Sequence, residues 1–197
     1  MFPLGLAMFP TQLLPLHVFE PRYRQMMADV LRLDADQSFG VSLIERGHEV
    51  GGGDTRTTVA TRVELVQAEE FEDGRWGIVT AGLERIEVVE WLPDDPYPQA
   101  MVQVRERVDD GGELAPVETL VVEALQLASR LTGQEIPDLA GLADDSLVRL
   151  DQLSALAPLA MFDRQTVLEA TSSTAQLAAL SDALELRIML MAAELGE

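Results

Sequence analysis

Side chains able to carry out covalent chemistry are scarce in this chain. Its 197 residues include no cysteine, no lysine and only two histidines, His17 and His48. The chain therefore has no thiol nucleophile, no amine for a Schiff base and no Ser–Lys dyad. His17 lies three residues before Glu20, and such a pair could act as base and acid. We favour a structural histidine and a carboxylate at a helix start, and predict no catalytic residue, metal site or cofactor.

Arg22, Tyr23 and Arg24 are the first candidates for binding. An arginine guanidinium forms two parallel hydrogen bonds with a carboxylate, so these residues could hold the carboxylate of a peptide. The alternative, which we favour, is that one of them, or Arg85, ties a helix to a sheet through Glu20.

Trp91 and Tyr97 are the second candidates, because they flank a turn. They either present an apolar surface to a partner, as aromatic residues at interfaces do, or cover one end of a barrel. The glycine run 51–53 lacks the lysine of a phosphate-binding loop, so we expect a plain loop there. Adjacent acidic residues fall at turns and helix starts, where Asp bonds to the backbone: Asp94–Asp95, Asp109–Asp110 and Asp144–Asp145.

The charge of the chain excludes several classes of partner. It carries 34 acidic and 14 basic residues, for a formal charge of −20. Such a field repels the phosphates of nucleic acids and anionic lipids. No apolar run approaches the ~18 residues of a membrane span. The start of the chain also lacks the basic region of a signal peptide. We therefore expect a cytoplasmic protein that binds neither nucleic acid nor membrane.

The first half of the chain has the pattern of a small barrel-like sheet. Short apolar runs alternate with polar residues between turn signals such as Asp73–Gly74. One early helix, from about Pro21 to Leu33, follows directly on a strand, with proline in its first turn. We expect Gly82 to break a strand. The other expected strands cover residues 38–44, 58–68, 76–79, 86–88 and 102–104.

The second half is helical throughout. Apolar residues recur every three or four positions from Val117 to Leu131, and Gly133 follows as a helix stop. Asp144–Ser146 offers an N-cap for the next helix, a short one follows near 163–170, and Ser172–Thr174 opens a long one. The cluster 189–191 could bind partners adaptably, as methionine does, but we expect it to pack that last helix into the core. With a turn-forming junction at 109–112, the chain divides into a β-rich part, 1–110, and a helical bundle, 111–197, in an α+β fold.

Several motifs, in the same order, resemble the N-terminal, substrate-binding domain of the Lon protease family. The first is Pro-Leu-His-Val-Phe-Glu-Pro-Arg-Tyr-Arg at 15–24. The others are the strand and glycine loop at 39–53, the hairpin at 73–88 and the turn at 91–100. The resemblance covers nearly the whole chain. It implies a PUA-like β pseudo-barrel followed by a C-terminal helical bundle, in a free-standing bacterial member without ATPase or protease domains.

The function implied by this resemblance is non-catalytic binding of proteins or peptides. The partners would be unfolded or client protein segments and, with them, a separate protease or ATPase. Two alternatives remain: a PUA-like domain that senses a small ligand, and a small hydrolase. The missing thiol and amine groups argue against the hydrolase. The sequence leaves the identity of the client and the oligomeric state open.

Overall fold

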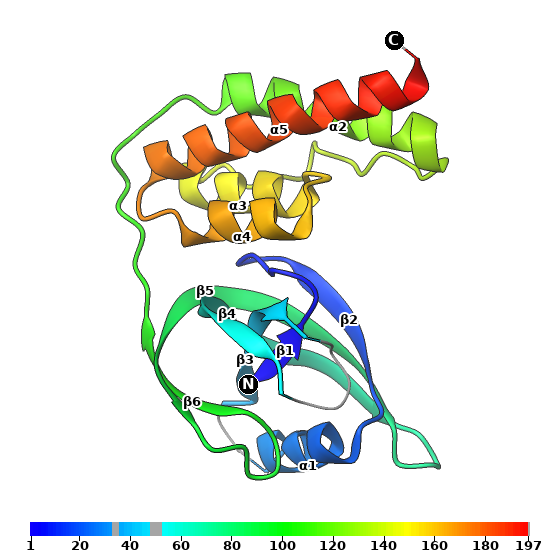
Figure 1. Cartoon of the computed structure of the whole chain (residues 1–197), viewed down its shortest axis with the longest axis vertical. Coiled ribbons are helices and arrows are strands. Elements are labelled where there is room, and N and C mark those ends of the chain that lie inside the picture. The colour runs from blue at the N-terminus through cyan, green and yellow to red at the C-terminus, as the bar shows by residue number, and fades with distance from the viewer. Residues whose placement is uncertain (33–35, 48–52, 197) are drawn as a thin grey trace. The chain divides into compact units, whose positions relative to one another are not determined.

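The computed structural model describes residues 1–32, 36–47 and 53–196. Within them the chain forms two compact units, Met1–Arg105 and Glu106–Glu197. His48 and most of the glycine run 51–53 lie outside the described residues. The first unit is a sheet with one helix, and the second is a group of helices, as an α+β fold requires (Figure 1).

The first unit is a six-stranded, strongly curled sheet. Its strand order is β1-β3-β4-β5-β2, and β6 pairs with the far part of β5. The β1 strand is parallel to β3, and all other pairs are antiparallel. The elements are β1 (Phe2–Leu4), β2 (Leu13–Val18), α1 (Pro21–Val30), β3 (Ser38–Arg46), β4 (Thr55–Glu70), β5 (Trp76–Leu92) and β6 (Gln99–Val104).

Two long strands carry this curl. The β4 and β5 strands have 16 and 17 residues and join at the turn around Asp73–Gly74. The expectation that Gly82 breaks a strand is wrong, because β5 runs through it. A Cβ on Gly82 would collide with the backbone carbonyl oxygen of Phe9, so glycine is needed where the 9–10 segment crosses β5. Shifts in register between β4 and β5 mark the bends that let the sheet curl.

Helix α1 packs across one end of the curled sheet (Figure 1). Pro21 occupies its first turn, where the missing N–H has no partner to lose, and Glu20 is its N-cap. Four residues at helical spacing form its buried face: Tyr23, Met26, Met27 and Val30. They join Phe2, Leu4, Val18 and Phe39 in one apolar core. The abrupt change from strand β2 to helix α1 therefore brings both elements onto the same core.

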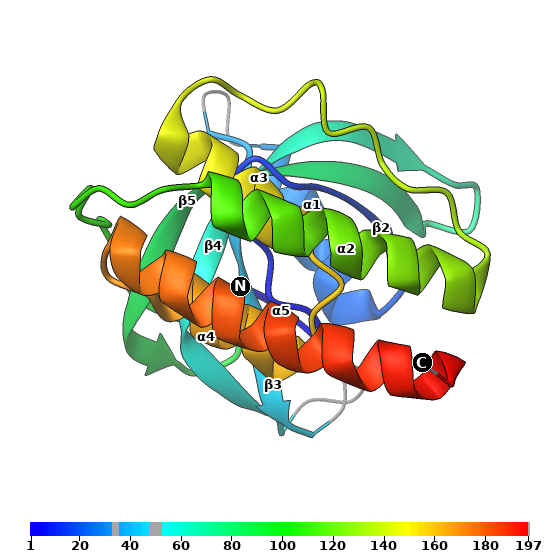
Figure 2. The same cartoon turned by 90° about the horizontal axis from the view of Figure 1, so that it is seen from above.

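The second unit consists of helices α2 (Ala115–Thr132), α3 (Ser146–Leu156), α4 (Met161–Glu169) and α5 (Ser173–Leu195). The two longest helices, α2 and α5, lie side by side (Figure 2). Predicted caps are present: Asp145 accepts a hydrogen bond from the N–H of Val148 at 2.9 Å, and Gly133 ends α2 with a φ of 75°. None of the helices in the described ranges is long and apolar enough to cross a bilayer.

A buried polar network ties the segment before α2 to α3 and α5. Arg107 donates to a carboxylate oxygen of Asp151 at 2.8 Å, and the two side chains are 6% and 7% exposed. The amide of Gln176 donates to Asp151 at 3.1 Å and to Ser154 at 3.0 Å. Next to this network, Asp110 accepts hydrogen bonds from Thr174, which lower the pKa of its carboxyl group. These bonds fix residues 107–110 onto the helical unit.

The expectation that residues 189–191 all pack in the core is partly wrong. Met191 is fully buried, but Met189 and Leu190 are 60% and 52% exposed. The three residues follow one another in α5, and 100° separates consecutive side chains on a helix. Met191 can therefore be buried within the helical unit while its two neighbours point outward.

Candidate functional site

The two outer strands of the curled sheet, β1 and β2, face each other, and within the described ranges no backbone pairing joins them. We call the space between them the seam. Each strand carries a proline, Pro3 in β1 and Pro15 in β2. A sheet tolerates proline at a position whose N–H would point away from the neighbouring strand. Pro15 lies opposite Val79 of β5. Antiparallel partners alternate between bonded and non-bonded pairs, so Leu13 and His17 also direct their backbone groups away from β5 and toward the seam.

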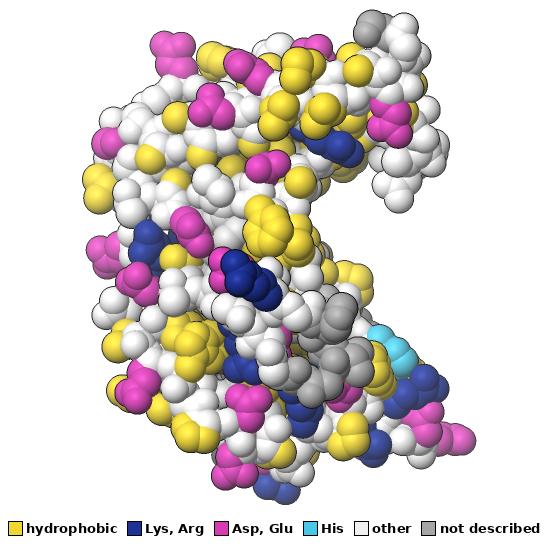
Figure 3. Space-filling view, in the orientation of Figure 1, with side chains coloured by type: hydrophobic (Ala, Val, Ile, Leu, Met, Phe, Trp, Pro, Cys, Tyr) yellow, Lys and Arg dark blue, Asp and Glu magenta, His cyan; other side chains and the backbone are white. Residues whose placement is uncertain are grey.

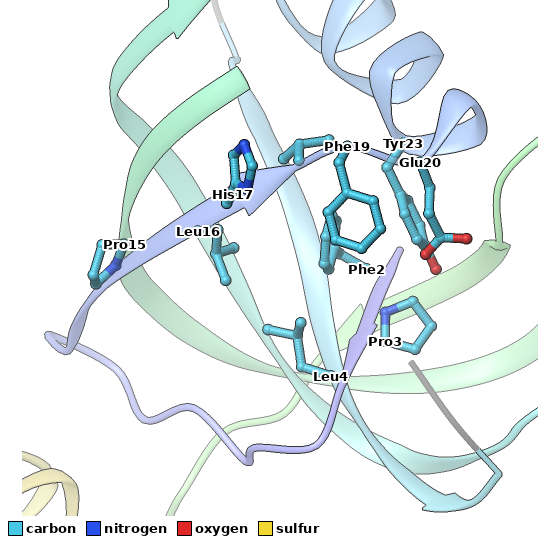
Figure 4. Close-up of a pocket in the computed structure, with 10 residues that line it drawn as sticks. Phe2, Pro3, Leu4, Pro15, Leu16, His17, Phe19, Glu20 and Tyr23 are labelled. Atoms are coloured by element: carbon cyan, nitrogen blue, oxygen red, sulfur yellow. The ribbon is translucent and has the colours of Figure 1, made fainter. Parts of the chain in front are cut away.

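A cavity of about 210 Å³ occupies the seam. Figure 4 shows Phe2 and Leu4 from β1 and Leu16 from β2 converging on it. Phe19 stands at its rim with a side chain that is 50% exposed. The cavity is smaller than the 300–1,000 Å³ typical of drug-sized ligands. An apolar cavity of ~150 Å³ holds one benzene molecule, so the seam has room for a single large side chain.

Tyr23 forms the polar end of this cavity. Its side chain is 3% exposed, and its ring lies 4.3 Å from the ring of Phe2 between centroids. The Tyr23 hydroxyl has no hydrogen-bond partner among the described residues. Burial raises the pKa of this hydroxyl to about 12, so it is protonated at neutral pH and keeps its proton to donate. A buried donor without a partner costs about 1–3 kcal/mol, which a ligand acceptor would recover.

Glu20 and Arg22 stand beside Tyr23. Nε of Arg22 donates to Glu20 at 3.2 Å, and its guanidinium lies 4.5 Å from the centroid of the Tyr23 ring. Figure 4 shows the Glu20 carboxylate next to the Tyr23 hydroxyl. Arg22 therefore pairs with Glu20 within one segment, at the start of α1. This pair does not tie α1 to the sheet, so it does not make the link through Glu20 that the sequence led us to expect.

Arg24 belongs to a different place. Its guanidinium lies against Gly74 in the β4–β5 turn, in a hollow lined also by Trp76. Residues two apart on a helix point in different directions, which explains why Arg22 and Arg24 do not converge. The structure brings Arg22 and Tyr23 together and leaves Arg24 apart. Their roles in binding remain predictions.

His17 lies on an exposed apolar patch, not in a buried site. Its ring is 6.1 Å from the ring of Phe19 and 6.1 Å from that of Phe71, which follows β4. Leu13, two strand positions from Pro15, is 63% exposed. We call Leu13, Pro15, His17, Phe19 and Phe71 the β2 patch. In Figure 4 His17 points away from the Glu20 carboxylate, so the two do not form an acid–base pair.

Trp91 and Tyr97 lie apart from the seam. The Arg56 guanidinium stacks over Trp91, 4.9 Å from the ring centroid, and also pairs with Asp54 at 2.5 Å. The Tyr97 hydroxyl donates to Asp29 of α1 at 3.2 Å, and its ring packs against the core. Tyr97 also lines a second cavity, of about 460 Å³, between α1, β3 and β6. Tyr97 therefore covers the end of the barrel, and a binding role for either residue remains a prediction.

The residues that sequence reasoning missed are the apolar ones around the seam: Phe2, Leu16, Phe19 and Phe71. The alternation in β2 was a signal, since every second residue from Leu13 to His17 is exposed. Phe71 lies more than 50 positions from His17 in the sequence, and no local pattern predicts that the two rings meet.

Comparison with known proteins agrees with this architecture. Residues 1–185 match the family model described as the ATP-dependent protease La (LON) substrate-binding domain. Lon protease 2 of Herpetosiphon aurantiacus is 28% identical over 171 residues, which cover 83% of this chain. They cover 20% of that protein, so the chain spans about a fifth of the length of this curated relative.

Two solved structures share the fold. One is the crystal structure of a Lon N-terminal domain protein from Xanthomonas campestris, with a TM-score of 0.65 and 23% identity over 92% of this chain and 95% of that one. The other is the N-terminal domain of a Mycobacterium avium complex Lon protease, with a TM-score of 0.58 and 18% identity over 93% and 96% of the two chains. The family model, which matches more than nine-tenths of the sequence, confirms the resemblance carried by the motifs at 15–24, 39–53, 73–88 and 91–100: the chain belongs to the Lon substrate-binding domain family.

Proposed function

We propose that this domain binds segments of other proteins without cutting them, as a substrate-recognition module in the cytoplasm. The observation that carries the proposal is the β2 patch, which exposes aromatic and aliphatic side chains next to the cavity in the seam. Exposed apolar groups that lie together mark interaction sites. The family supports the proposal, because the description of its model refers to substrate binding.

The charge of the chain favours one kind of client. Acidic side chains are spread over the face shown in Figure 3, and the formal charge is −20. This field attracts basic segments and repels acidic ones and nucleic acids. It also keeps the domain soluble while its apolar patch is exposed. We therefore expect clients that are apolar at the contact and neutral or basic around it.

Unfolding and cleavage of a client would need other machinery. Residues 1–197 contain neither lysine nor cysteine, so this stretch cannot supply a Ser–Lys dyad, a thiol nucleophile or the lysine of a phosphate-binding loop. We propose that a protease or ATPase supplies these steps and that this domain delivers the client to it.

The test is binding of an unfolded protein before and after the patch is made polar. Wild type should bind reduced, carboxamidomethylated ribonuclease A, an unfolded basic protein, in calorimetry and bind native ribonuclease A far more weakly. The double variant Phe19→Ser/Phe71→Ser should lose at least ~10-fold in affinity, because each removes an exposed aromatic anchor. Phe162→Ser is the matched control, since Phe162 of α4 is 53% exposed but lies in the other unit. Equal binding by all three proteins would refute the patch as the contact site.

A second candidate is recognition of a small ligand at the 460 Å³ cavity lined by Tyr97. Its volume falls within the range of small-molecule sites, and the Tyr97–Asp29 hydrogen bond supplies polar groups. A metabolite that raises the Tm of wild type, but not of Tyr97→Ala, would support this function. A screen without such a metabolite would leave protein binding as the better account.

A further inference from the structure

We propose that the seam between β1 and β2 takes up an extended segment of the client as an added strand beside β2, with one large apolar side chain seated in the 210 Å³ cavity. This inference deepens the proposed function, on which it rests, by assigning a site and a binding mode. Three independent features of the seam lead to it: the free edge of β2, the cavity and the buried Tyr23 hydroxyl.

The backbone of β2 offers an edge that another strand can use. The N–H of Gly82 in β5 donates to the carbonyl of Gln12, which sets the alternation along β2. The backbone N–H and C=O groups of Leu14, Leu16 and Val18 then point toward β5. Those of Leu13 and His17 point toward the seam. Outside the strand ladder, no described residue bonds to these seam-facing backbone groups. An extended peptide satisfies such an edge with its own main chain.

The cavity and the β2 patch lie on opposite faces of the strand that would be added. Successive side chains of a strand alternate between faces. One side chain would enter the cavity between Phe2, Leu4 and Leu16, and its two neighbours would point outward onto His17 and Phe19. The preferred client is therefore a run of about three apolar residues, with a large one at the centre. Folded proteins bury such runs, and unfolded ones expose them.

Tyr23 and Glu20 determine which residues the bound segment can carry beside its anchor. The Tyr23 hydroxyl, buried and unpartnered in the described structure, can donate to a backbone carbonyl of the client. The Glu20 carboxylate next to it repels an acidic residue at that position (Figure 4). The seam should therefore take neutral or basic segments and reject those with Asp or Glu beside the anchor.

The variant Tyr23→Phe separates binding from folding. Removing an unpartnered buried hydroxyl should leave the Tm unchanged or higher, while it weakens binding of a segment that bonds to it. The probe is a fluorescein-labelled, blocked nonapeptide, Gly-Ser-Arg-Val-Phe-Val-Arg-Ser-Gly, measured by anisotropy with the full chain. We expect Tyr23→Phe to bind it about 10-fold more weakly, the loss of one hydrogen bond. The matched control Tyr97→Phe, which breaks the bond to Asp29, should lower the Tm without changing peptide affinity.

The added strand has its own signature in amide exchange. Bound peptide should slow hydrogen exchange at the N–H of His17, which faces the seam, and leave the N–H of Leu16, already in the ladder with β5, unchanged. A peptide with Asp in place of Phe should neither bind nor protect. N-methylation of the two valines should abolish binding, because it removes backbone donors.

The outcomes distinguish this inference from the proposed function. If the chain binds carboxamidomethylated ribonuclease A but not the nonapeptide, or if Tyr23→Phe and Tyr97→Phe bind the peptide as wild type does, the seam is not the site and the proposed function stands. If peptide binds without slowing exchange at His17, the added strand is wrong. If neither the unfolded protein nor the peptide binds, the proposed function itself fails.

Discussion

Asp151→Ala should destabilise the helical unit more than any surface change. Asp151 is buried and accepts hydrogen bonds from Arg107 and Gln176. Removing one partner of a buried ion pair leaves the other charge without compensation, at a cost of about 3–5 kcal/mol. In a unit of this size, each kcal/mol lowers the Tm by about 4–8 °C. We therefore expect the Tm of the helical unit to fall by ~12 °C or more.

Far-UV circular dichroism at 222 nm, supported by urea unfolding, measures this loss. Asp182→Ala in α5 is the control, because Asp182 is exposed and such a change stays within ~0.5 kcal/mol. The double variant Arg107→Met/Asp151→Leu should lose less than the sum of the single changes, since it removes both charges together. A free energy of unfolding within ~1 kcal/mol of wild type for Asp151→Ala would show that the pair contributes little, and the reasoning on the network would be wrong.

Three further predictions concern the boundary between the units, the crossing at Gly82 and Tyr23. We propose that the two units are separate domains. In calorimetry a fragment 106–197, which keeps Arg107 and its buried ion pair, should have a Tm well above that of a fragment 111–197. Equal Tm values would contradict this. Gly82→Ala should cost about 1–3 kcal/mol in urea unfolding because its Cβ meets the Phe9 carbonyl, whereas Gly141→Ala, with open space around it, should cost far less. The pKa of Tyr23 is raised to about 12, so the unfolded state loses this proton first and the free energy of unfolding should fall as the pH rises from about 10 to 12. Tyr23→Phe should flatten that decline in urea unfolding measured across this pH range. An unchanged slope would count against the prediction.

Local signals predicted most of the fold. Pro21, Asp145, Ser172 and Gly133 mark helix ends by chemistry that acts over three or four residues, and the structure has helix ends at each of them. The wrong expectation at Gly82 has a related cause. As a local signal, a glycine in a strand indicates a break, and only the crossing of the 9–10 segment shows why one is needed there.

The site was harder to predict than the elements. In the sequence Tyr23 is marked by the arginines on either side. In the structure it is distinguished by burial beside Phe2, the first residue of β1, which no spacing in the sequence reveals. Arg24 seemed equivalent to Arg22 as a neighbour in sequence, and the geometry of a helix separates them. Phe71 meets His17 only because β2 lies beside the start of β5. Long-range pairing thus decides the site, and a sequence pattern gives no account of it.

The order of strands also affects how this protein folds. Leu14 of β2 bonds with Thr80, 66 positions later, and among the described strands β1 pairs with β3 alone. During synthesis both outer strands emerge well before their partners, and their apolar residues are exposed until β5 has been made. The β-rich unit should therefore fold more slowly than the helices, whose backbone bonds form within a few residues. In that interval this chain would itself need protection from aggregation.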